Sequence, residues 1–270
     1  MVLVELFDLL RALCVLAVKW FSSIDPMSRL PRFFITPDQV QSGRVSIIGD
    51  DVRHITTVLR MKPGNELLLS DGQGCEYQVR IVVAGKQEVL TEIIESRRRE
   101  TLGPRITLGQ GLPKSDKMDW IVQKATELNV SSIVPLVTER TIVKIRDEEK
   151  RIARWQKIAR EAAMQSDRTD IPKVEAICQF TDFLSTQHSA LSTLLLLPWE
   201  EGTEPIKNVL TKNADVRHIV VLIGPEGGFS KPEAEAAKER GFRLVSLGPN
   251  ILRTETAAIA ALAMIGYEYV

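Results

Sequence analysis

The chain has 270 residues and 44% of them are hydrophobic, which supplies enough apolar surface for one large folded domain or two smaller ones. This composition excludes a disordered protein. Basic and acidic residues both number 35, so the formal charge is zero, and any binding of nucleic acid must depend on local basic patches. The cysteines, Cys14, Cys75 and Cys178, match no metal-binding or disulfide pattern, which is typical of reduced thiols in a cytoplasmic protein.

Residues 1–27 include the most apolar stretch near either end of the chain. A transmembrane helix needs about 20 almost uninterrupted apolar residues. Charged residues interrupt this stretch at Glu5, Asp8, Arg11 and Lys19. A secretory signal starts with basic residues and ends in small ones, whereas here the first charges are acidic and Trp20 and Phe21 stand where small residues belong. We therefore expect an N-terminal extension that takes no part in the chemistry, and no association with a membrane.

Residues 28–100 have the pattern of short β-strands. From Glu76 to Val83 the side chains alternate, which predicts a half-buried strand. Its inward face would carry Tyr77, Val79, Ile81 and Val83. Other short apolar runs, separated by turns, are 33–35, 45–48, 67–69 and 89–94, and one helical insert covers 51–60. Several short strands in one small region predict a small β-barrel.

A charged run at residues 95–100, followed by Gly103 and Pro104, marks the expected domain boundary, with Arg97, Arg98 and Arg99 in a solvated linker. Beyond it, residues 101–270 alternate between apolar strands and amphipathic helices. The expected strands are 105–108, 133–137, 194–197, 219–223 and 244–247, and the clearest helices are 116–129 and 147–165. Continuous apolar strands separated by helices predict a parallel sheet covered on both faces.

The first loop of chemical interest is Gly224–Ser230 (GPEGGFS), which follows an expected strand. Ser230 and Glu233 form an S-x-x-E capping box at the start of the next helix, and Gly241 is its expected stop. A glycine-rich loop before a helix N-terminus suggests an anion-binding site. The Walker A and G-x-G-x-x-G patterns are both missing from the sequence, so a structural turn remains an alternative.

A second loop, LGPNILRTET, begins at Leu247 and leads into an apolar, Ala-rich C-terminal helix suited to close packing or a dimer contact. Thr254 or Thr256 can cap that helix. Arg253 cannot be explained in this way, because a cation at a helix N-terminus opposes the helix dipole. Arg253 is therefore a functional candidate.

These two loops together strongly resemble the ribosomal RNA small subunit methyltransferase E family, which methylates N3 of a uridine in 16S ribosomal RNA. The resemblance covers nearly all of residues 28–265. It includes the segments HITTVLRMKPG, SDGQG, LPKSDKMDWIVQKATELNVSSIVPL and EAAMQSDRTDIPKV. The sequence departs from the family pattern at Met164, Asp167 and Asn250 and after Gly266.

The resemblance implies an α/β fold: a small PUA-like β-barrel domain (28–100) that binds RNA, followed by a SPOUT-type trefoil-knotted parallel-sheet domain (101–270). It implies S-adenosylmethionine as cofactor, bound in the knot, and a homodimer that completes the active site. The residues that would bind the cofactor are Leu197, Pro198, Gly224, Glu226, Gly228, Leu247, Gly248, Ile251, Leu252 and Thr254.

Methyl transfer requires alignment of donor and acceptor and loss of the uracil N3 proton. We assign Arg253 to orienting the base or stabilising the negative charge that develops on it. Glu255 or Glu226 would accept the proton, with capping or an ion pair as the alternative for each. Candidates for RNA contacts are Arg32, Arg60, Lys114, Lys117, Arg140 and Arg168. We expect no metal, because His54, His188 and His218 lack ligand spacing.

Two other functions remain open at this point. A SPOUT enzyme could methylate another base or a ribose 2′-hydroxyl, and a chain with the same fold could be a non-catalytic RNA-binding or ribosome-assembly module.

Overall fold

The computed structural model describes residues 30–99, 103–143, 147–186 and 192–269. The expected extension at residues 1–27 lies outside this range. The described chain forms two compact units, one with residues 30–71 and 75–98 and the other with residues 72–74 and the chain from residue 99 onward.

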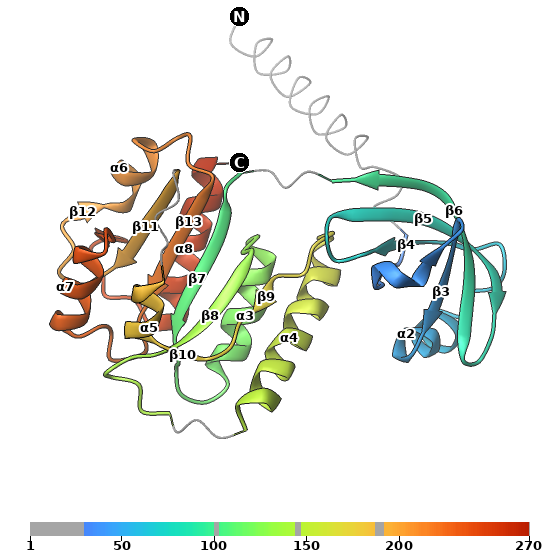
Figure 1. The fold of residues 1–270 in the computed structure, drawn as a ribbon, viewed down its shortest axis with the longest axis horizontal. Helices are drawn as coiled ribbons and strands as arrows, with labels where there is room; N and C mark the ends of the chain where they lie inside the picture. Colours follow the sequence, from blue (N-terminus) through green and yellow to red (C-terminus); the bar gives the residue numbers. More distant parts are fainter. Residues whose placement is uncertain (1–29, 100–102, 144–146, 187–191, 270) are drawn as a thin grey trace, which may run out of the picture. The chain divides into compact units, whose positions relative to one another are not determined.

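The first unit is a strongly curled, mostly antiparallel sheet (Figure 1). Its elements are β1 (Arg32–Phe34), the 3₁₀ turn η2 (Pro37–Gln39), β2 (Val40–Gln41), β3 (Arg44–Ile48), α2 (Asp50–Arg53), the π-helical turn η3 (His54–Val58), β4 (Glu66–Ser70), β5 (Cys75–Ala84) and β6 (Glu88–Arg98). The strand order is β1-β4-β5-β6-β3-β2, and only the β1–β4 pair is parallel. The short strands and the helical insert expected from the sequence are therefore present.

Two details of this sheet differ from the expectation. The register shifts between Ile81 and Val83, so Val83 is 52% exposed although Ile81 is buried. A bulge of this kind moves the following side chains to the other face. The expected solvated linker is wrong for Arg97 and Arg98, because β6 extends to Arg98. A buried glutamate also holds Arg97 in an ion pair.

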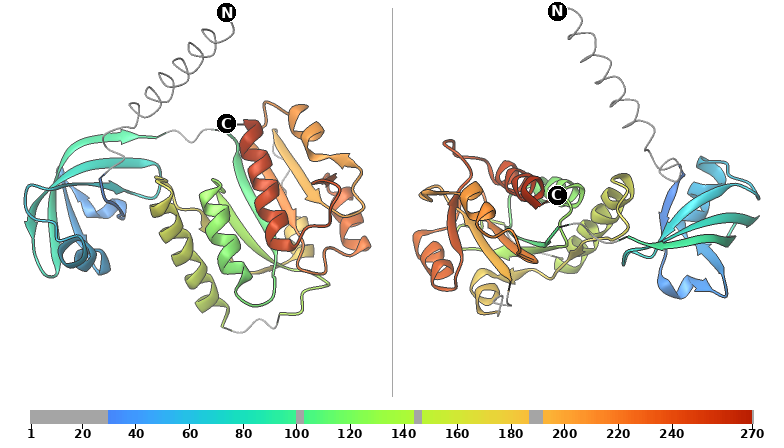
Figure 2. Two further views of the ribbon diagram at one scale, coloured as in Figure 1. Left: turned by 180° about the vertical axis from the view of Figure 1, so that it is seen from behind. Right: turned by 90° about the horizontal axis from the view of Figure 1, so that it is seen from above.

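The second unit is an eight-stranded parallel sheet with helices on both faces (Figure 2). Its elements are β7 (Arg105–Gly111), α3 (Lys117–Glu127), β8 (Ser132–Val137), α4 (Glu148–Gln165), β9 (Lys173–Val174), β10 (Cys178–Gln179), α5 (Phe180–Ser185), β11 (Thr193–Pro198), β12 (Glu204–Pro205), α6 (Ile206–Thr211), β13 (His218–Ile223), α7 (Lys231–Glu239), β14 (Arg243–Ser246) and α8 (Thr254–Tyr269). The order is β10-β8-β7-β13-β11-β14-β12, with β9 beside β8. The expected strands and helices all occur, with ends that differ by a few residues.

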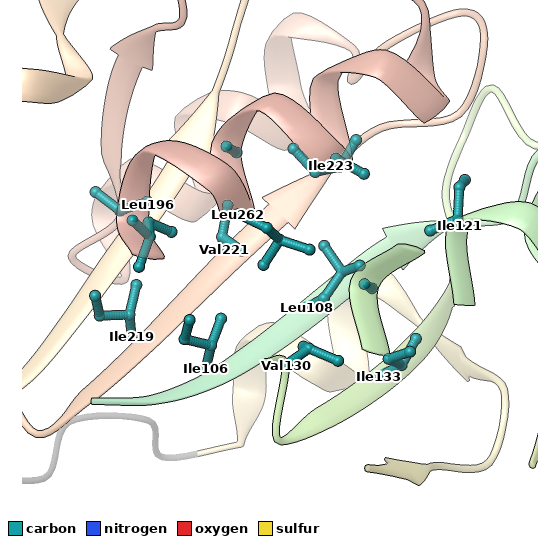
Figure 3. Close-up of a cluster of buried hydrophobic side chains, with 14 of the residues drawn as sticks. Ile106, Leu108, Ile121, Val130, Ile133, Leu196, Ile219, Val221, Ile223 and Leu262 are labelled. Atoms are coloured by element: carbon teal, nitrogen blue, oxygen red, sulfur yellow. The ribbon is translucent and has the colours of Figure 1, made fainter. Parts of the chain in front are cut away.

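Strand β13 shows why this sheet needs cover on both sides. Ile219, Val221 and Ile223 face one hydrophobic cluster, which packs against α3, α6 and α8 (Figure 3). Val220 and Leu222 face a second cluster with α5 and α7. Each fully buried Val, Leu or Ile contributes about 1.5–3 kcal/mol to folding. The two clusters fix the sheet, and the sheet in turn fixes the loops at its carboxyl edge.

Candidate functional site

A pocket lies at the carboxyl ends of β11, β13 and β14, where open parallel sheets usually bind ligands. It encloses about 900 Å³ of empty space, part of which is open to solvent. The lining residues are Pro198, Trp199, Glu200, Ile223, Gly224, Pro225, Glu226, Gly227, Gly228, Phe229, Ser246, Leu247, Gly248, Pro249, Asn250, Ile251, Leu252, Thr254 and Ala257. Both sequence-derived loops therefore meet here.

The structure brings nearly all of the expected cofactor residues to this pocket. Leu197 is the exception: its side chain is fully buried in the second hydrophobic cluster and does not line the pocket. Trp199, which directly follows β11, lines the pocket and was not expected. The sequence could have predicted this role, because Trp199 directly follows an apolar strand.

The loop Gly224–Ser230 needs glycine for two different reasons. A Cβ on Gly224 would lie 2.8 Å from the backbone carbon of Gly228, so the loop closes tightly on itself there. Gly228 has φ +67° and open space around a would-be Cβ, so it combines a left-handed backbone with room for a ligand. These features favour a built binding loop over an ordinary turn.

Neighbouring elements hold this loop in place. The capping box is confirmed: Ser230 Oγ accepts from the backbone N–H of Glu233, and the Glu233 carboxylate accepts from the N–H of Ser230. The second oxygen of Glu233 accepts from the backbone N–H of Glu139 at 2.8 Å. Arg140 donates to the carbonyl of Gly227. The segment after β8 is thus fastened to the glycine loop.

The second loop is tied to the first through Thr254 at the start of α8. Thr254 is 5% exposed, and its hydroxyl donates to the carbonyl of Gly224. The same hydroxyl accepts from Gln110 Nε2 at 2.9 Å. Gln110 is fully buried and also donates to the carbonyl of Gly111. This buried group of hydrogen bonds joins the ends of β7 and β13 to α8. In the sequence, a glutamine inside an apolar strand was the signal that could have predicted it.

Gly248 in the second loop has φ +140°, a backbone conformation that disfavours other residues, and a Cβ there would meet open space. Ile251 is 85% exposed although it lines the pocket. Leu247 and Leu252 are partly buried beside it. The loop therefore offers apolar side chains and a close backbone approach on the same wall of the pocket.

The two candidate proton acceptors meet at one cation. Lys117 Nζ lies 3.1 Å from Glu226 Oε1 and 3.3 Å from Glu255 Oε2. Glu226 also accepts from the backbone N–H of Lys114 at 3.0 Å. Burial raises the pKa of Glu226, but its hydrogen bonds to backbone N–H groups and the Lys117 ammonium outweigh burial and hold this pKa below its usual value of 4.5. The hydrogen bond to Glu226 raises the pKa of Lys117.

Arg253 and Glu255 do not line the pocket formed by this single chain. Arg253 is exposed, and within the described part of the chain no hydrogen bond or ion pair holds its guanidinium. Arg253 lies directly before α8, where its charge opposes the helix dipole. Its position thus fits a side chain kept available for a group from outside the chain.

The structure divides the residues expected to contact RNA into three groups. Arg60, Lys114 and Arg140 are exposed. Lys117 is partly exposed and pairs with Glu226 and Glu255. Arg32 and Arg168 are not available, which corrects the expectation for these two residues: Arg32 is 7% exposed and pairs with the fully buried Glu76, and Arg168 is 8% exposed.

The buried Arg168 bridges parts of the second unit. It donates to the carbonyl of Thr126 at 2.8 Å and pairs with Asp170. Burial of a charged guanidinium is costly unless it is paired. We therefore assign Arg168 and the Arg32–Glu76 pair to holding their own domains together.

Among residues 30–99, 103–143, 147–186 and 192–269 there is no group of three or more His, Cys, Asp or Glu side chains placed to hold a metal ion. His188 lies outside these ranges. Within the same ranges, every helix is too short or too polar to cross a membrane.

Comparison with known families gives two consistent matches. A family described as "RNA methyltransferase domain" matches residues 100–266, and a family described as "RNA methyltransferase PUA domain" matches residues 47–94. Ribosomal RNA small subunit methyltransferase E of Bacillus subtilis is 33% identical, with 88% of this chain and 97% of the relative covered. The protein of the same name from Synechocystis is 32% identical, with 87% and 76% covered.

Solved structures agree with the sequence comparison. The crystal structure of a ribosomal RNA small subunit methyltransferase E from Neisseria gonorrhoeae, bound to S-adenosyl methionine, has a TM-score of 0.79 at 34% identity and covers 88% of this chain and 98% of its own. A methyltransferase from Legionella pneumophila in complex with the same cofactor has a TM-score of 0.77 at 31% identity, with 88% and 98% covered. The expected order of domains, a PUA-like domain before a parallel-sheet methyltransferase domain, is confirmed. Since the first family matches more than half of the chain and relatives of over 30% identity span most of it, the chain belongs to the ribosomal RNA small subunit methyltransferase E family.

Proposed function

We propose that this chain transfers a methyl group from S-adenosylmethionine to N3 of a uridine in the 16S ribosomal RNA of the small subunit. The observation that carries the proposal is the pocket formed by two glycine-bearing loops at the carboxyl edge of the parallel sheet. Membership of the methyltransferase family supports the reaction class. We assign RNA recognition to residues 28–100 and methyl transfer to residues 101–270, in a cytoplasmic protein.

The pocket suits the chemistry of this cofactor. Gly228 and Gly248 leave space that a side chain would fill, so backbone groups can reach the adenosine. Leu247, Ile251 and Leu252 can enclose the adenine ring, as apolar side chains do in many nucleotide sites. When bound, the cofactor supplies a methyl group on a positively charged sulfur.

The chain's own residues must then align the uridine, remove its N3 proton and stabilise the charge that results. We assign the guanidinium of Arg253 to stabilising the negative charge that develops on the base. A carboxylate accepts the proton, and Glu255 and Glu226 are the two candidates beside the pocket loops. Arg253 has no partner of its own in the described residues, which supports a role toward a bound base.

We further propose that two copies of the chain form a homodimer. Arg253 and Glu255 do not line the pocket of a single chain. A second copy placed against the start of α8 would bring a pocket and these side chains together. The oligomeric state in solution, measured by light scattering, tests this part independently of activity.

The proposed RNA contacts are the exposed side chains of Arg60 in the first unit and of Lys114 and Arg140 in the second. Each phosphate contact releases counterions, so the affinity for the small subunit should fall steeply as salt rises. Binding that does not depend on salt would contradict this assignment.

Arg253→Ala is the test of the active-site assignment. Loss of a charge-stabilising group typically lowers kcat about 100-fold or more, and the affinity for S-adenosylmethionine should change by less than about threefold, because Arg253 does not line the pocket. Arg243→Ala, at the opposite end of β14, is the matched control and should leave both values unchanged. Unchanged turnover in Arg253→Ala would remove this residue from the mechanism.

Analysis of the modified nucleoside by mass spectrometry separates the proposed reaction from the alternatives. Methylation at another base position or at a ribose 2′-hydroxyl would keep the fold and the cofactor but change the product. Absence of cofactor binding in calorimetry, with and without RNA, would favour a non-catalytic RNA-binding module.

A further inference from the structure

Lys117 is the first residue of α3, and this is an unfavourable place for a cation because the helix dipole is positive there. The nearby Asp116 and Asp119 pair with Arg154 and not with Lys117. Lys117 pairs with two carboxylates from distant parts of the chain, Glu226 and Glu255. Its partners are therefore set by tertiary packing and not by its own helix.

The two carboxylates differ in how many donors they already have. Glu226 accepts from the backbone N–H of Lys114 as well as from the Lys117 ammonium. Glu255 has a buried oxygen, Oε2, for which the described structure offers no hydrogen bond, only the Lys117 ammonium at 3.3 Å. Glu226 is thus held by donors from two loops, whereas a buried oxygen of Glu255 has room for a further donor.

We propose that Lys117 is a positioning residue that holds Glu255 as the proton acceptor and fastens Glu226 as a structural clamp. Lys117 is therefore not an RNA contact. The proposal rests on the proposed function, because it names the base of that reaction. In the step, the N3 proton of uracil passes to the Glu255 carboxylate, and the nitrogen electron pair forms the new bond to the methyl carbon. The electron pair of the broken sulfur–carbon bond stays on sulfur.

The geometry explains why a cation is required at this point. Without the Lys117 ammonium, Glu226 and Glu255 would face each other across a partly buried gap, where side-chain exposure is 31% and 17%. Like charges so placed repel, and one carboxylate would take up a proton more readily. A displaced or protonated Glu255 cannot accept the uracil proton, so the loss would fall on turnover more than on binding.

The test compares Lys117→Met and Lys117→Arg with Lys124→Met, a matched control on the same helix where the lysine pairs with Glu127. Kinetics use small subunits that lack the methylation. We expect Lys117→Met to lower kcat at least about tenfold, to move the acidic limb of the kcat profile to higher pH, and to leave KM for the RNA within about twofold. Lys117→Arg should restore most of the activity, and Lys124→Met should behave as the parent chain.

A second readout does not depend on activity. Carbon-13 NMR of the glutamate carboxyl groups, assigned with Glu226→Gln and Glu255→Gln, gives the titration midpoint of each group. In Lys117→Met the midpoint of Glu226 should move to higher pH, because the ammonium that helps to lower its pKa is lost, and in Lys124→Met it should not move. An unchanged Glu226 midpoint in Lys117→Met would overturn the proposal whatever the kinetics show.

A higher KM for RNA with a shallower salt dependence and unchanged kcat in Lys117→Met would also overturn it, and would make Lys117 a phosphate contact. If the unaltered protein transfers no methyl group to RNA, the proposed function fails. The carboxyl titrations then still decide whether Lys117 holds the two glutamates.

Discussion

Thr254 is the residue whose replacement tests most directly how the two pocket loops are held together. Its hydroxyl donates to the carbonyl of Gly224 and accepts from Gln110, and it is almost fully buried. Thr254→Val keeps the shape of the side chain but removes both hydrogen bonds. The carbonyl of Gly224 retains only a long contact of 3.4 Å to Gln110.

The magnitude follows from these contacts. A buried polar group left without a partner costs about 1–3 kcal/mol. Gln110 keeps its bond to the carbonyl of Gly111 at 2.8 Å, so the main loss is at Gly224. We therefore expect Thr254→Val to lower the free energy of unfolding by about 2 kcal/mol, which corresponds to a Tm lower by about 4–8 °C for a domain of this size.

Urea unfolding and thermal melting measure this loss, with Thr254→Ser as the variant that keeps the hydroxyl. Thr211→Val is the matched surface control, because Thr211 is exposed and its hydroxyl bonds within its own helix and to Glu268. It should cost less than about 0.5 kcal/mol. The reasoning is refuted if Thr254→Val costs as little as Thr211→Val, or if Thr254→Ser is as damaging as Thr254→Val.

Three further predictions concern other parts of the chain. Gly224→Ala should weaken binding of S-adenosylmethionine at least about tenfold in calorimetry, because its Cβ would lie 2.8 Å from the Gly228 backbone; Gly266→Ala in α8, where a Cβ meets nothing within 4 Å, should bind normally and gain up to about 1 kcal/mol of stability. The pKa of Glu226 in the folded chain is below its ordinary value of 4.5. The stability that Glu226 contributes is therefore fully present above pH 4.5 and is lost as the pH falls through the lower pKa of the folded chain. Urea midpoints of the parent and Glu226→Gln should therefore converge below pH 4.5, and a gap that persists in acid would contradict this. Glu76→Gln should lower the free energy of unfolding by about 3 kcal/mol or more, because two arginines lose their buried counter-charge; a loss under about 1 kcal/mol would show that the pair is not needed.

Much of the fold was accessible from the sequence, because burial on both faces of a parallel sheet leaves a continuous apolar run. Strand β13 is an example: its side chains are fully buried on both faces, Val220 and Leu222 on one and Val221 on the other, so the strand could be predicted from its apolar run.

The strands of the first unit were harder to predict from the sequence. Its bulge at Val83 and the fully buried charge of Glu76 break the alternation, and neither can be read from a period of two.

The candidate site was accessible only in part. The two glycine loops follow strand ends, and their residues meet in one pocket as the positions of parallel strands require. The roles of the basic residues were ambiguous, because the sequence alone does not distinguish a buried arginine from an exposed one. Arg168 is buried against a carboxylate, whereas Arg60 is exposed. The approach of Lys117 to Glu226 and Glu255 depends on tertiary packing, and no local pattern encodes it.

The most direct test of the account is the transfer of label from radioactive S-adenosylmethionine to small ribosomal subunits that lack this methylation, followed by digestion of the RNA and identification of the labelled nucleoside. The account predicts label in 3-methyluridine, and little label with Arg253→Ala. Label in a different nucleoside, or none while the cofactor still binds, would contradict the proposed reaction.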